Sequence, residues 1–139
     1  MSDDACVFCA LIESGDGVWV AREGHAAAFL TLPTGALAPG HTLVVPTAHC
    51  VGVLDASPES LAATTALVQR VSVAMTEALG ATGVVVLNAS GPFSGVTVGH
   101  LHFHVVPRWP DDEAELWPSD RSSHPPIPDA GELLATVLR

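Results

Sequence analysis

Three histidines, His100, His102 and His104, alternate with apolar residues in this 139-residue sequence. Successive side chains of a β-strand point to opposite faces of the sheet, so the spacing predicts a row of three imidazoles on one face. A neutral imidazole is both a good nucleophile and a common metal ligand near neutral pH. The row can therefore bind a metal ion, supply a nucleophile with its helpers, or form an inert polar face. The inert alternative is the weakest, because solvated strand faces usually carry Thr, Lys or Glu.

A second group of reactive residues lies near the N-terminus. Cys6 and Cys9 form a Cys-x-x-Cys motif, and Cys50 is the third cysteine of the chain. An odd number of cysteines without an export signal argues against a disulfide framework. The motif is therefore either a redox pair or half of a metal site. We expect Cys50 to be a small buried apolar residue and not a further ligand.

The charge of the chain excludes several classes of partner. Fifteen Asp and Glu residues against five Arg and no Lys give a formal net charge of -10. A protein that binds nucleic acid along its phosphates needs a basic face, which five scattered arginines do not provide. An acidic surface disfavours anionic membranes, and no apolar run is long enough to span a bilayer. The N-terminus, Met1 to Asp4, is acidic where a signal peptide is basic, so we expect a cytoplasmic protein.

The elements that must position these residues are one long helix and several strands. We expect strands over residues 18–20, 26–32, 42–45, 83–88 and 100–106. This order predicts an α+β domain with a mainly antiparallel sheet.

The long helix is expected to begin at Pro58, with Ser57 as its N-cap, and to end near Gly80. Six residues at helical spacing are expected to form its buried face: Leu61, Thr65, Val68, Ser72, Met75 and Leu79.

The composition changes after Trp109, where acidic residues and then a Ser- and Pro-rich stretch follow. We therefore divide the chain into a domain of residues 1–110 and a C-terminal tail of residues 111–139. The tail is expected to be extended, with a possible short helix over 131–139.

Two blocks of the sequence resemble the histidine triad (HIT) superfamily. They are Pro39-Gly-His-Thr-Leu-Val-Val-Pro46, with His49 shortly after it, and His100-Leu-His-Phe-His-Val-Val-Pro-Arg108. Cys6-Val-Phe-Cys9 and Ala28-Phe-Leu30 are similar to the bacterial, Hint-like branch. The resemblance extends from about Cys6 to Trp109. It implies a HIT domain over residues 1–110, with a five-stranded, mainly antiparallel sheet, one long helix and short helices. It also implies a homodimer in which two such sheets join.

HIT proteins are mostly nucleotide hydrolases or transferases, and the resemblance implies the same activity here. His102 occupies the position of the residue that attacks the α-phosphate of nucleoside phosphoramidates, phosphate esters or dinucleoside polyphosphates and forms a covalent nucleotidyl-histidine. A backbone carbonyl bonded to one ring nitrogen would fix its tautomer. His104 would contact the phosphate or the leaving group, and His41 would line the same pocket. The expected ligand is a purine nucleotide or a related phosphate-containing small molecule.

The same resemblance implies a set of substrate-binding residues: Phe29, Thr31, Asn88, Ser90, Gly95 and Thr97. Backbone N–H groups of residues 91–97 and the Thr97 hydroxyl would hold the phosphate. Three positions depart from the family pattern. Thr31 stands where many relatives carry a ribose-binding Asp, Ala89 where Asn is usual, and Val96 where a Gln contacts phosphate. These departures favour an alternative, a nucleotide sensor or interaction protein of the HIT fold with little catalytic activity.

The resemblance also implies a structural zinc ion bound by Cys6, Cys9, His49 and His100. Two cysteines and two histidines suit a closed tetrahedral zinc site, which stabilises a small domain without taking part in the reaction. A third hypothesis makes the chain a metal hydrolase with the three histidines of the row as ligands. The two metal hypotheses differ in whether Cys6 is required.

Overall fold

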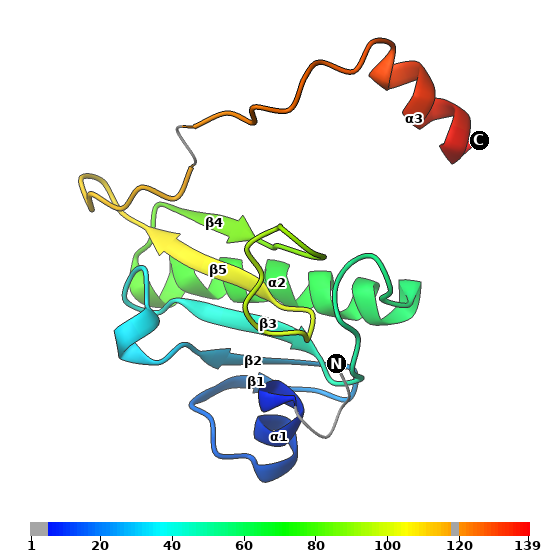
Figure 1. The fold of residues 1–139 in the computed structure, drawn as a ribbon. Coiled ribbons are helices and arrows are strands. Elements are labelled where there is room, and N and C mark those ends of the chain that lie inside the picture. Colours follow the sequence, from blue (N-terminus) through cyan, green and yellow to red (C-terminus); the bar gives the residue numbers. More distant parts are fainter. Residues whose placement is uncertain (1–5, 118–119) are drawn as a thin grey trace.

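The computed structural model describes residues 6–117 and 120–139, and it contains a five-stranded antiparallel sheet (Figure 1). The acidic N-terminus, Met1 to Asp4, lies outside the described residues. The strand order is β1-β2-β3-β5-β4, and every neighbouring pair is antiparallel. The strands are β1 (Trp19–Arg22), β2 (Ala26–Leu30), β3 (Thr42–Pro46), β4 (Gly83–Leu87) and β5 (Phe103–Arg108). The predicted α+β architecture is confirmed.

The long helix α2 (Pro58–Leu79) packs against one face of the sheet. Its N-cap is Ser57, whose Oγ accepts a hydrogen bond from the Ser60 N–H at 3.1 Å, and Gly80 ends it in the left-handed conformation at φ 67°. Both ends were predicted because such caps are local signals.

The predicted buried face of α2 is partly wrong. Thr65 and Leu79 are exposed. The buried residues are Thr64, Leu67, Val68, Val71 and Met75. At 3.6 residues per turn, the true face is rotated by roughly 60° from the predicted one. The periodicity of apolar residues locates the apolar side of the helix, but packing against the sheet determines which of those residues are buried.

Each face of the sheet carries its own apolar cluster. The face under α2 contributes Ala26, Ala28, Val44 and Val105 to the main core. The opposite face carries Ala27, Phe29, Leu43 and Val45, which pack with Cys6 and Phe8. Buried residues on both faces explain why β2 is apolar throughout and β3 is apolar after Thr42.

A short helix, α1 (Val7–Ser14), covers that opposite face and contains Cys9 of the Cys-x-x-Cys motif. The Cys6 thiol caps it by accepting a hydrogen bond from the Cys9 N–H at 3.3 Å. This helix was not predicted from the sequence, because cysteine is not among the usual N-cap residues.

The predicted start of the last strand is wrong, because β5 begins at Phe103 and not at His100. Its N-terminal neighbours make other hydrogen bonds instead: the Leu101 N–H donates to the Cys50 carbonyl, and the His100 carbonyl accepts from the His102 ring. β5 also continues through Pro107 to Arg108. β3 pairs with β5 only as far as Val105, so the missing N–H of Pro107 breaks no ladder bond there.

After β5 the chain leaves the sheet, and the helix α3 (Ala130–Leu138) lies apart from the domain (Figure 1). The expected short C-terminal helix is therefore present. A small 3₁₀ turn, η2 (Pro33–Gly35), precedes β3. Among the described residues, no helix has the length and apolar character needed to cross a membrane.

Candidate active site

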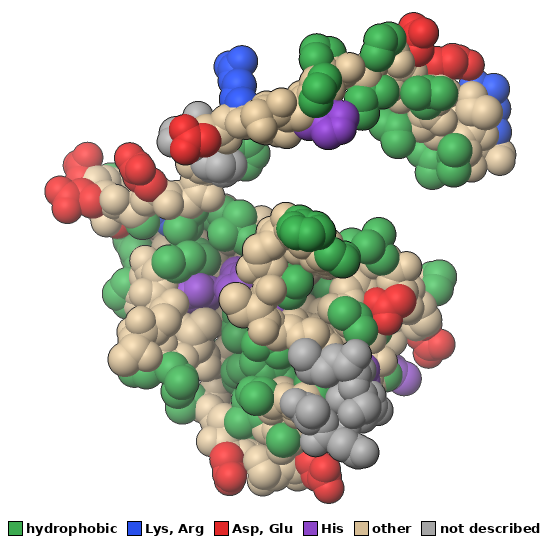
Figure 2. All heavy atoms as spheres, in the orientation of Figure 1, with side chains coloured by type: hydrophobic (Ala, Val, Ile, Leu, Met, Phe, Trp, Pro, Cys, Tyr) green, Lys and Arg blue, Asp and Glu red, His purple; other side chains and the backbone are tan. Residues whose placement is uncertain are grey.

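His102 and His104 line a cavity of about 280 Å³ at the start of β5. The end of β4 and the loop that follows it complete the lining with Leu87, Asn88, Ala89, Gly95, Val96 and Thr97. Figure 2 shows histidine side chains in a hollow of the domain beneath the start of the tail. The fold thus brings Asn88, Gly95 and Thr97 beside the two histidines.

The His102 ring is held in one tautomer by its own backbone neighbourhood. Its Nδ1 lies 2.8 Å from the His100 carbonyl oxygen, and both groups are buried. A carbonyl only accepts, so Nδ1 carries the proton and Nε2 carries the lone pair. The Asn88 side-chain amide donates to the His102 carbonyl at 2.9 Å. Ring and backbone of this residue are therefore both fixed.

His41 and His104 form a hydrogen-bonded pair whose polarity is also set by the backbone. The Leu37 N–H donates to His41 Nδ1 at 3.0 Å, so the His41 proton is on Nε2. Nε2 lies 2.9 Å from His104 Nδ1 and donates to it. His104 therefore carries its own proton on Nε2.

Burial keeps both rings of this pair neutral at pH 7. Desolvation lowers the pKa of His41. Desolvation, with the neighbouring His102 and His41 rings, lowers the pKa of His104 to about 4. A neutral ring still offers an N–H donor, so His104 can bind an anionic oxygen without being charged.

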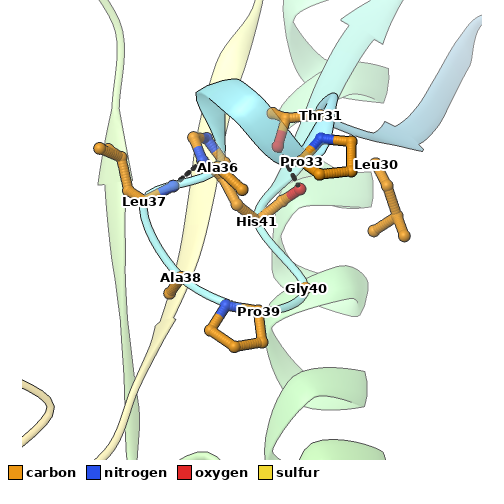
Figure 3. Close-up of a pocket in the computed structure, with 9 residues that line it drawn as sticks. All are labelled: Leu30, Thr31, Pro33, Ala36, Leu37, Ala38, Pro39, Gly40 and His41. Carbon is orange, nitrogen blue, oxygen red and sulfur yellow. Dashed lines mark hydrogen bonds between the residues drawn. The ribbon is translucent and has the colours of Figure 1, made fainter.

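A second cavity of about 520 Å³ adjoins His41 and is lined by residues of β2, η2 and the turn before β3 (Figure 3). Thr31 lines it, and its hydroxyl donates to the His41 carbonyl oxygen at 3.4 Å. Gly40 closes the turn at φ 85°, where a Cβ would lie 2.7 Å from Leu79 of α2. The left-handed backbone favours glycine before His41, because the end of the Leu79 side chain can move but the positive φ remains strained for any other residue.

Two of the predicted substrate residues line neither cavity. Phe29 is buried between Phe8 and Trp19, with ring centroids 5.4 and 5.6 Å away. The Ser90 hydroxyl donates to Asn88 Oδ1 at 2.8 Å and accepts from the Val53 N–H at 3.0 Å. Ser90 thus stands behind Asn88 and orients the amide that holds His102.

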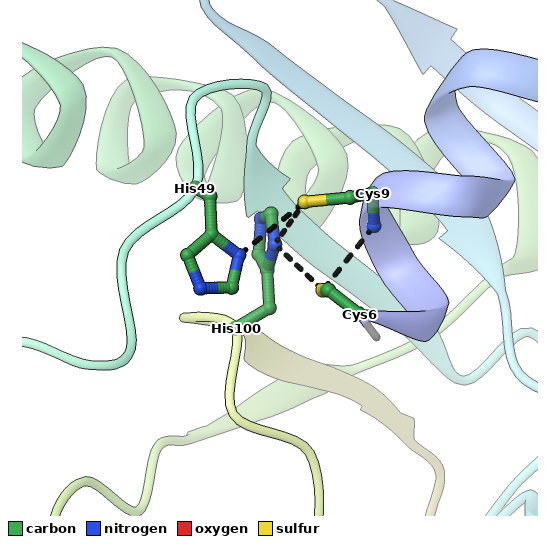
Figure 4. A group of neighbouring side chains, drawn as sticks. All are labelled: Cys6, Cys9, His49 and His100. Carbon is green, nitrogen blue, oxygen red and sulfur yellow. Dashed lines mark hydrogen bonds between the residues drawn. The ribbon is translucent and has the colours of Figure 1, made fainter. Parts of the chain in front are cut away.

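Cys6, Cys9, His49 and His100 meet in one cluster, and their ligand atoms all lie within 4.8 Å of one another (Figure 4). Sγ–Nδ1 distances are 3.4 Å for Cys6–His100, 3.3 Å for Cys9–His49 and 3.5 Å for Cys9–His100. A tetrahedral zinc ion with ordinary Zn–S and Zn–N bonds gives S···N edges of about 3.5 Å. The His100 Nε2–H donates to the Pro46 carbonyl at 2.8 Å, which turns Nδ1 toward the thiols. The four residues fit a metal ion.

The predicted row of three histidines is therefore wrong in its geometry. The His100 ring points to the two cysteines, whereas the His102 and His104 rings lie 5.0 Å apart at the cavity. Alternation fails because the backbone before Phe103 is not a strand. His102 Nδ1 is bonded to a carbonyl and His104 Nδ1 to His41, so the row lacks the geometry of a three-histidine metal site.

Two groups that shape this site could not be predicted from the sequence. The Leu37 N–H orients His41, and nothing in the sequence marks it because every residue except proline supplies such a group. The Phe8 ring packs edge to face on His102 at a centroid distance of 5.3 Å. Its position inside Cys6-Val-Phe-Cys9 was the only available signal.

Comparison with known proteins shows what the sequence and the fold resemble. The sequence profile of the HIT domain matches residues 16–111. An uncharacterized HIT-like protein of Saccharolobus solfataricus is 38% identical over 109 residues, or 77% of this chain and 76% of that protein. The adenosine 5'-monophosphoramidase hnt1 of Schizosaccharomyces pombe is 31% identical over 138 residues, or 97% and 99% of the two chains. A zinc-bound histidine triad family protein of Mycobacterium smegmatis superposes with a TM-score of 0.75 and 34% identity, covering 86% and 87%.

A five-stranded antiparallel sheet with a histidine cluster at the start of β5 defines a protein of the histidine triad class. The chain belongs to the HIT domain family. That family includes a hydrolase among the relatives of this chain, the monophosphoramidase of S. pombe.

Proposed function

We propose that this protein is a nucleotide hydrolase or transferase that cleaves at the α-phosphate through a covalent nucleotidyl-His102. The substrates are nucleoside phosphoramidates, phosphate esters or dinucleoside polyphosphates. One observation carries the proposal: the 2.8 Å bond from His102 Nδ1 to the His100 carbonyl leaves the Nε2 lone pair for a nucleophilic role. Similarity to the monophosphoramidase over nearly the whole chain supports it.

Two displacements at phosphorus make up the reaction. His102 Nε2 attacks the α-phosphorus, the bond to the leaving group breaks, and the leaving group takes the electron pair and a proton from solvent. Water then attacks the phosphorus of the nucleotidyl-histidine, releases the nucleoside monophosphate and returns the electron pair to Nε2. The His100 carbonyl stabilises the positive charge that develops on the His102 ring in the first step.

Neutral donors bind the phosphate in this proposal. The His104 Nε2–H, the Thr97 hydroxyl and the backbone at Gly95 lie at one cavity. Dipoles aimed at a developing charge stabilise it well in a site shielded from water. The adjoining cavity at His41 takes the nucleoside, and the Thr31 hydroxyl faces the ribose in place of a carboxylate. Ser90 orients the Asn88 amide from behind the lining, and that amide holds the backbone of His102.

Replacement of the nucleophile tests the proposal. We expect His102→Ala to lower turnover of adenosine phosphoramidate and of dinucleoside polyphosphates by at least about 10³-fold. Released monophosphate measures turnover, and intact-protein mass after rapid quenching detects the covalent nucleotide, which His102→Ala will lack. His25→Ala is the matched control, because His25 is exposed and lines neither cavity. Normal activity of His102→Ala refutes the mechanism.

A second candidate is a nucleotide sensor or interaction protein with little catalysis. Ala89 and Val96 favour it, because both place apolar side chains in the lining of the His102 cavity. In that case the wild-type protein binds nucleotide in a calorimeter but releases no monophosphate from any of these substrates.

We further propose that the metal ion is structural zinc and that the protein is a cytoplasmic homodimer. A zinc ion held by four protein ligands stabilises the fold and takes no part in the reaction. The donor set and the 3.3–3.5 Å separations support zinc, as does the zinc-bound relative. A reducing cytoplasm would keep Cys6 and Cys9 as thiols.

A further inference from the structure

We infer that Phe8 is a positioning residue, which couples the occupancy of the metal site to the geometry of His102. The inference rests on the proposed function only for the role of His102 as nucleophile. The metal cluster and the His102 cavity are built on the same short segments of the chain. These shared segments link the two sites mechanically.

Phe8 is the first part of this link. It lies between the two cysteine ligands, in the first turn of α1, and its side chain is buried. The ring packs edge to face on His102, with centroids 5.3 Å apart and planes at 85°. It also packs on the ligand His100, at 6.0 Å and 71°. One side chain of the Cys-x-x-Cys segment therefore covers both a metal ligand and the nucleophile.

His100 is the second part of this link, because its side chain and its backbone carbonyl belong to different sites. Its imidazole belongs to the metal cluster, and its carbonyl accepts the hydrogen bond that sets the His102 tautomer. A third connection joins Cys50, which follows the ligand His49, to Leu101, whose N–H donates to the Cys50 carbonyl at 2.8 Å. Movement of the ligands therefore moves the groups that surround His102.

A bound metal ion makes the position of Phe8 definite. The ion joins Cys6 and Cys9 of α1 to His49 and His100, which fixes the first turn of the helix relative to the sheet. Without the ion, α1 is held by apolar packing, which is not directional, and by hydrogen bonds from the Trp19 and Arg22 side chains to carbonyls at its C-terminal end. The thiol–imidazole contacts at its first turn are weaker than bonds to a metal ion. A helix of eight residues is too short to be stable by itself. The Phe8 ring then has more than one orientation against His102.

Catalysis depends on this orientation because the attacking lone pair must point at phosphorus. A misplacement of about 1 Å costs up to roughly 10²-fold in rate. We expect Phe8→Leu, which keeps an apolar side chain but removes the flat ring, to lower kcat by about 10-fold or more. KM should change much less, because Phe8 lines neither cavity. Phe8→Tyr retains the ring and should restore most of kcat.

The decisive measurement uses the protein without substrate. Nitrogen-15 NMR of the histidine rings distinguishes Nδ1–H from Nε2–H tautomers. We expect zinc-loaded wild type to show His102 as a single Nδ1–H tautomer, and both Phe8→Leu and chelator-stripped wild type to show mixed or exchange-broadened signals. Leu11→Ala is the matched control, since Leu11 packs on the same cluster from the same helix. It should keep both the tautomer and one zinc ion per chain.

Several outcomes overturn the inference. One is an unchanged His102 spectrum after the metal is stripped. Another is a Phe8→Leu protein that holds zinc and keeps both the wild-type spectrum and kcat. Equal disturbance by Leu11→Ala also refutes it, since loss of helix packing would then explain the effect. The NMR result does not depend on turnover, so a protein that proves to be a sensor still tests the link between Phe8 and His102.

Discussion

His104 shows how a strongly acidic chain can bind an anion without using cations. It is half-buried beside two other imidazoles, so protonation would bring a charge into a poorly hydrated site near potential like charges. Its pKa near 4 keeps it neutral across the physiological range. Hydrogen bonds from neutral rings, hydroxyls and backbone groups must then provide the recognition of phosphate.

The depressed pKa of His104 makes folding stability depend on pH. An unfolded chain has a histidine pKa near 6.5, so below that pH the unfolded state binds more protons than the folded state. Stability is therefore full above about pH 6.5 and is lost as the pH falls toward 4. His41, whose pKa is also lowered, contributes in the same direction.

Urea unfolding between pH 7.5 and 4.5 measures this dependence. We expect the midpoint to fall with pH in the wild type and the fall to be smaller in His104→Gln. His124→Gln changes an exposed residue of the tail and should leave the slope as it is. An identical slope for wild type and His104→Gln contradicts the assignment of a neutral, half-buried ring.

Residue types were predictable from the sequence, and the family resemblance also implied that a backbone carbonyl fixes the His102 tautomer, as the His100 carbonyl does. Which backbone groups set the tautomers was not predictable. The spacing of His100, His102 and His104 and the family blocks indicated the reactive residues. The tautomers of His102 and His41 depend on a carbonyl and on the Leu37 N–H, and backbone groups have no sequence signature. The division of the three histidines between two sites likewise depended on where β5 begins.

At the scale of elements, α1 needs support from outside itself. It has eight residues, whereas isolated helices shorter than about 12–15 residues are marginal in water. Its support comes from the apolar cluster around Phe8 and, in the proposed zinc-bound protein, from Cys6 and Cys9 at its start. Loss of the proposed zinc ion should therefore lower the free energy of unfolding of the domain.

Loss of one thiol tests the contribution of the metal to stability. We expect Cys6→Ala to lose bound zinc and to lower Tm by about 10 °C or more. Cys50→Ala is the matched control, because Cys50 is also buried but lies outside the ligand cluster. It should lose stability through a small cavity and keep its zinc. Elemental analysis and calorimetry give the two readouts, and zinc retained by Cys6→Ala contradicts the four-residue site.

Elements with local start and stop signals were predictable. Ser57, Pro58 and Gly80 specify α2 within the chain segment itself, and Pro46 closes β3. The start of β5 was not predictable in this way, because the His100 carbonyl and the Leu101 N–H bind groups outside the sheet. The covered face of α2 also depended on its contacts with the sheet.

At the scale of the whole molecule, one edge of the sheet suits contact with another copy. β4 is an edge strand without charge, and Val86 is 43% exposed on it. Uncharged edges with unpaired backbone groups tend to pair with other strands. The proposed homodimer would continue the sheet across this edge.

Solution mass tests this arrangement. Light scattering of the wild type should give twice the chain mass of 14.3 kDa. Val86→Lys places a charge at the edge, and we expect it to shift the protein toward monomer. Val18→Lys is the control, because Val18 is exposed at the far side of the sheet beside β1. A dimer that withstands Val86→Lys excludes the β4 edge as the contact.

The N-cap of α1, Cys6, has two roles, and this restricts which residues can replace it during evolution. One sulfur atom of Cys6 both accepts the Cys9 N–H that starts the helix and lies 3.4 Å from the ring of His100. Serine would keep the cap and lose the soft ligand, and alanine would lose both. Several other residues could cap the helix at this position, but each of them would remove the thiol ligand. The two roles of Cys6 therefore cannot change independently.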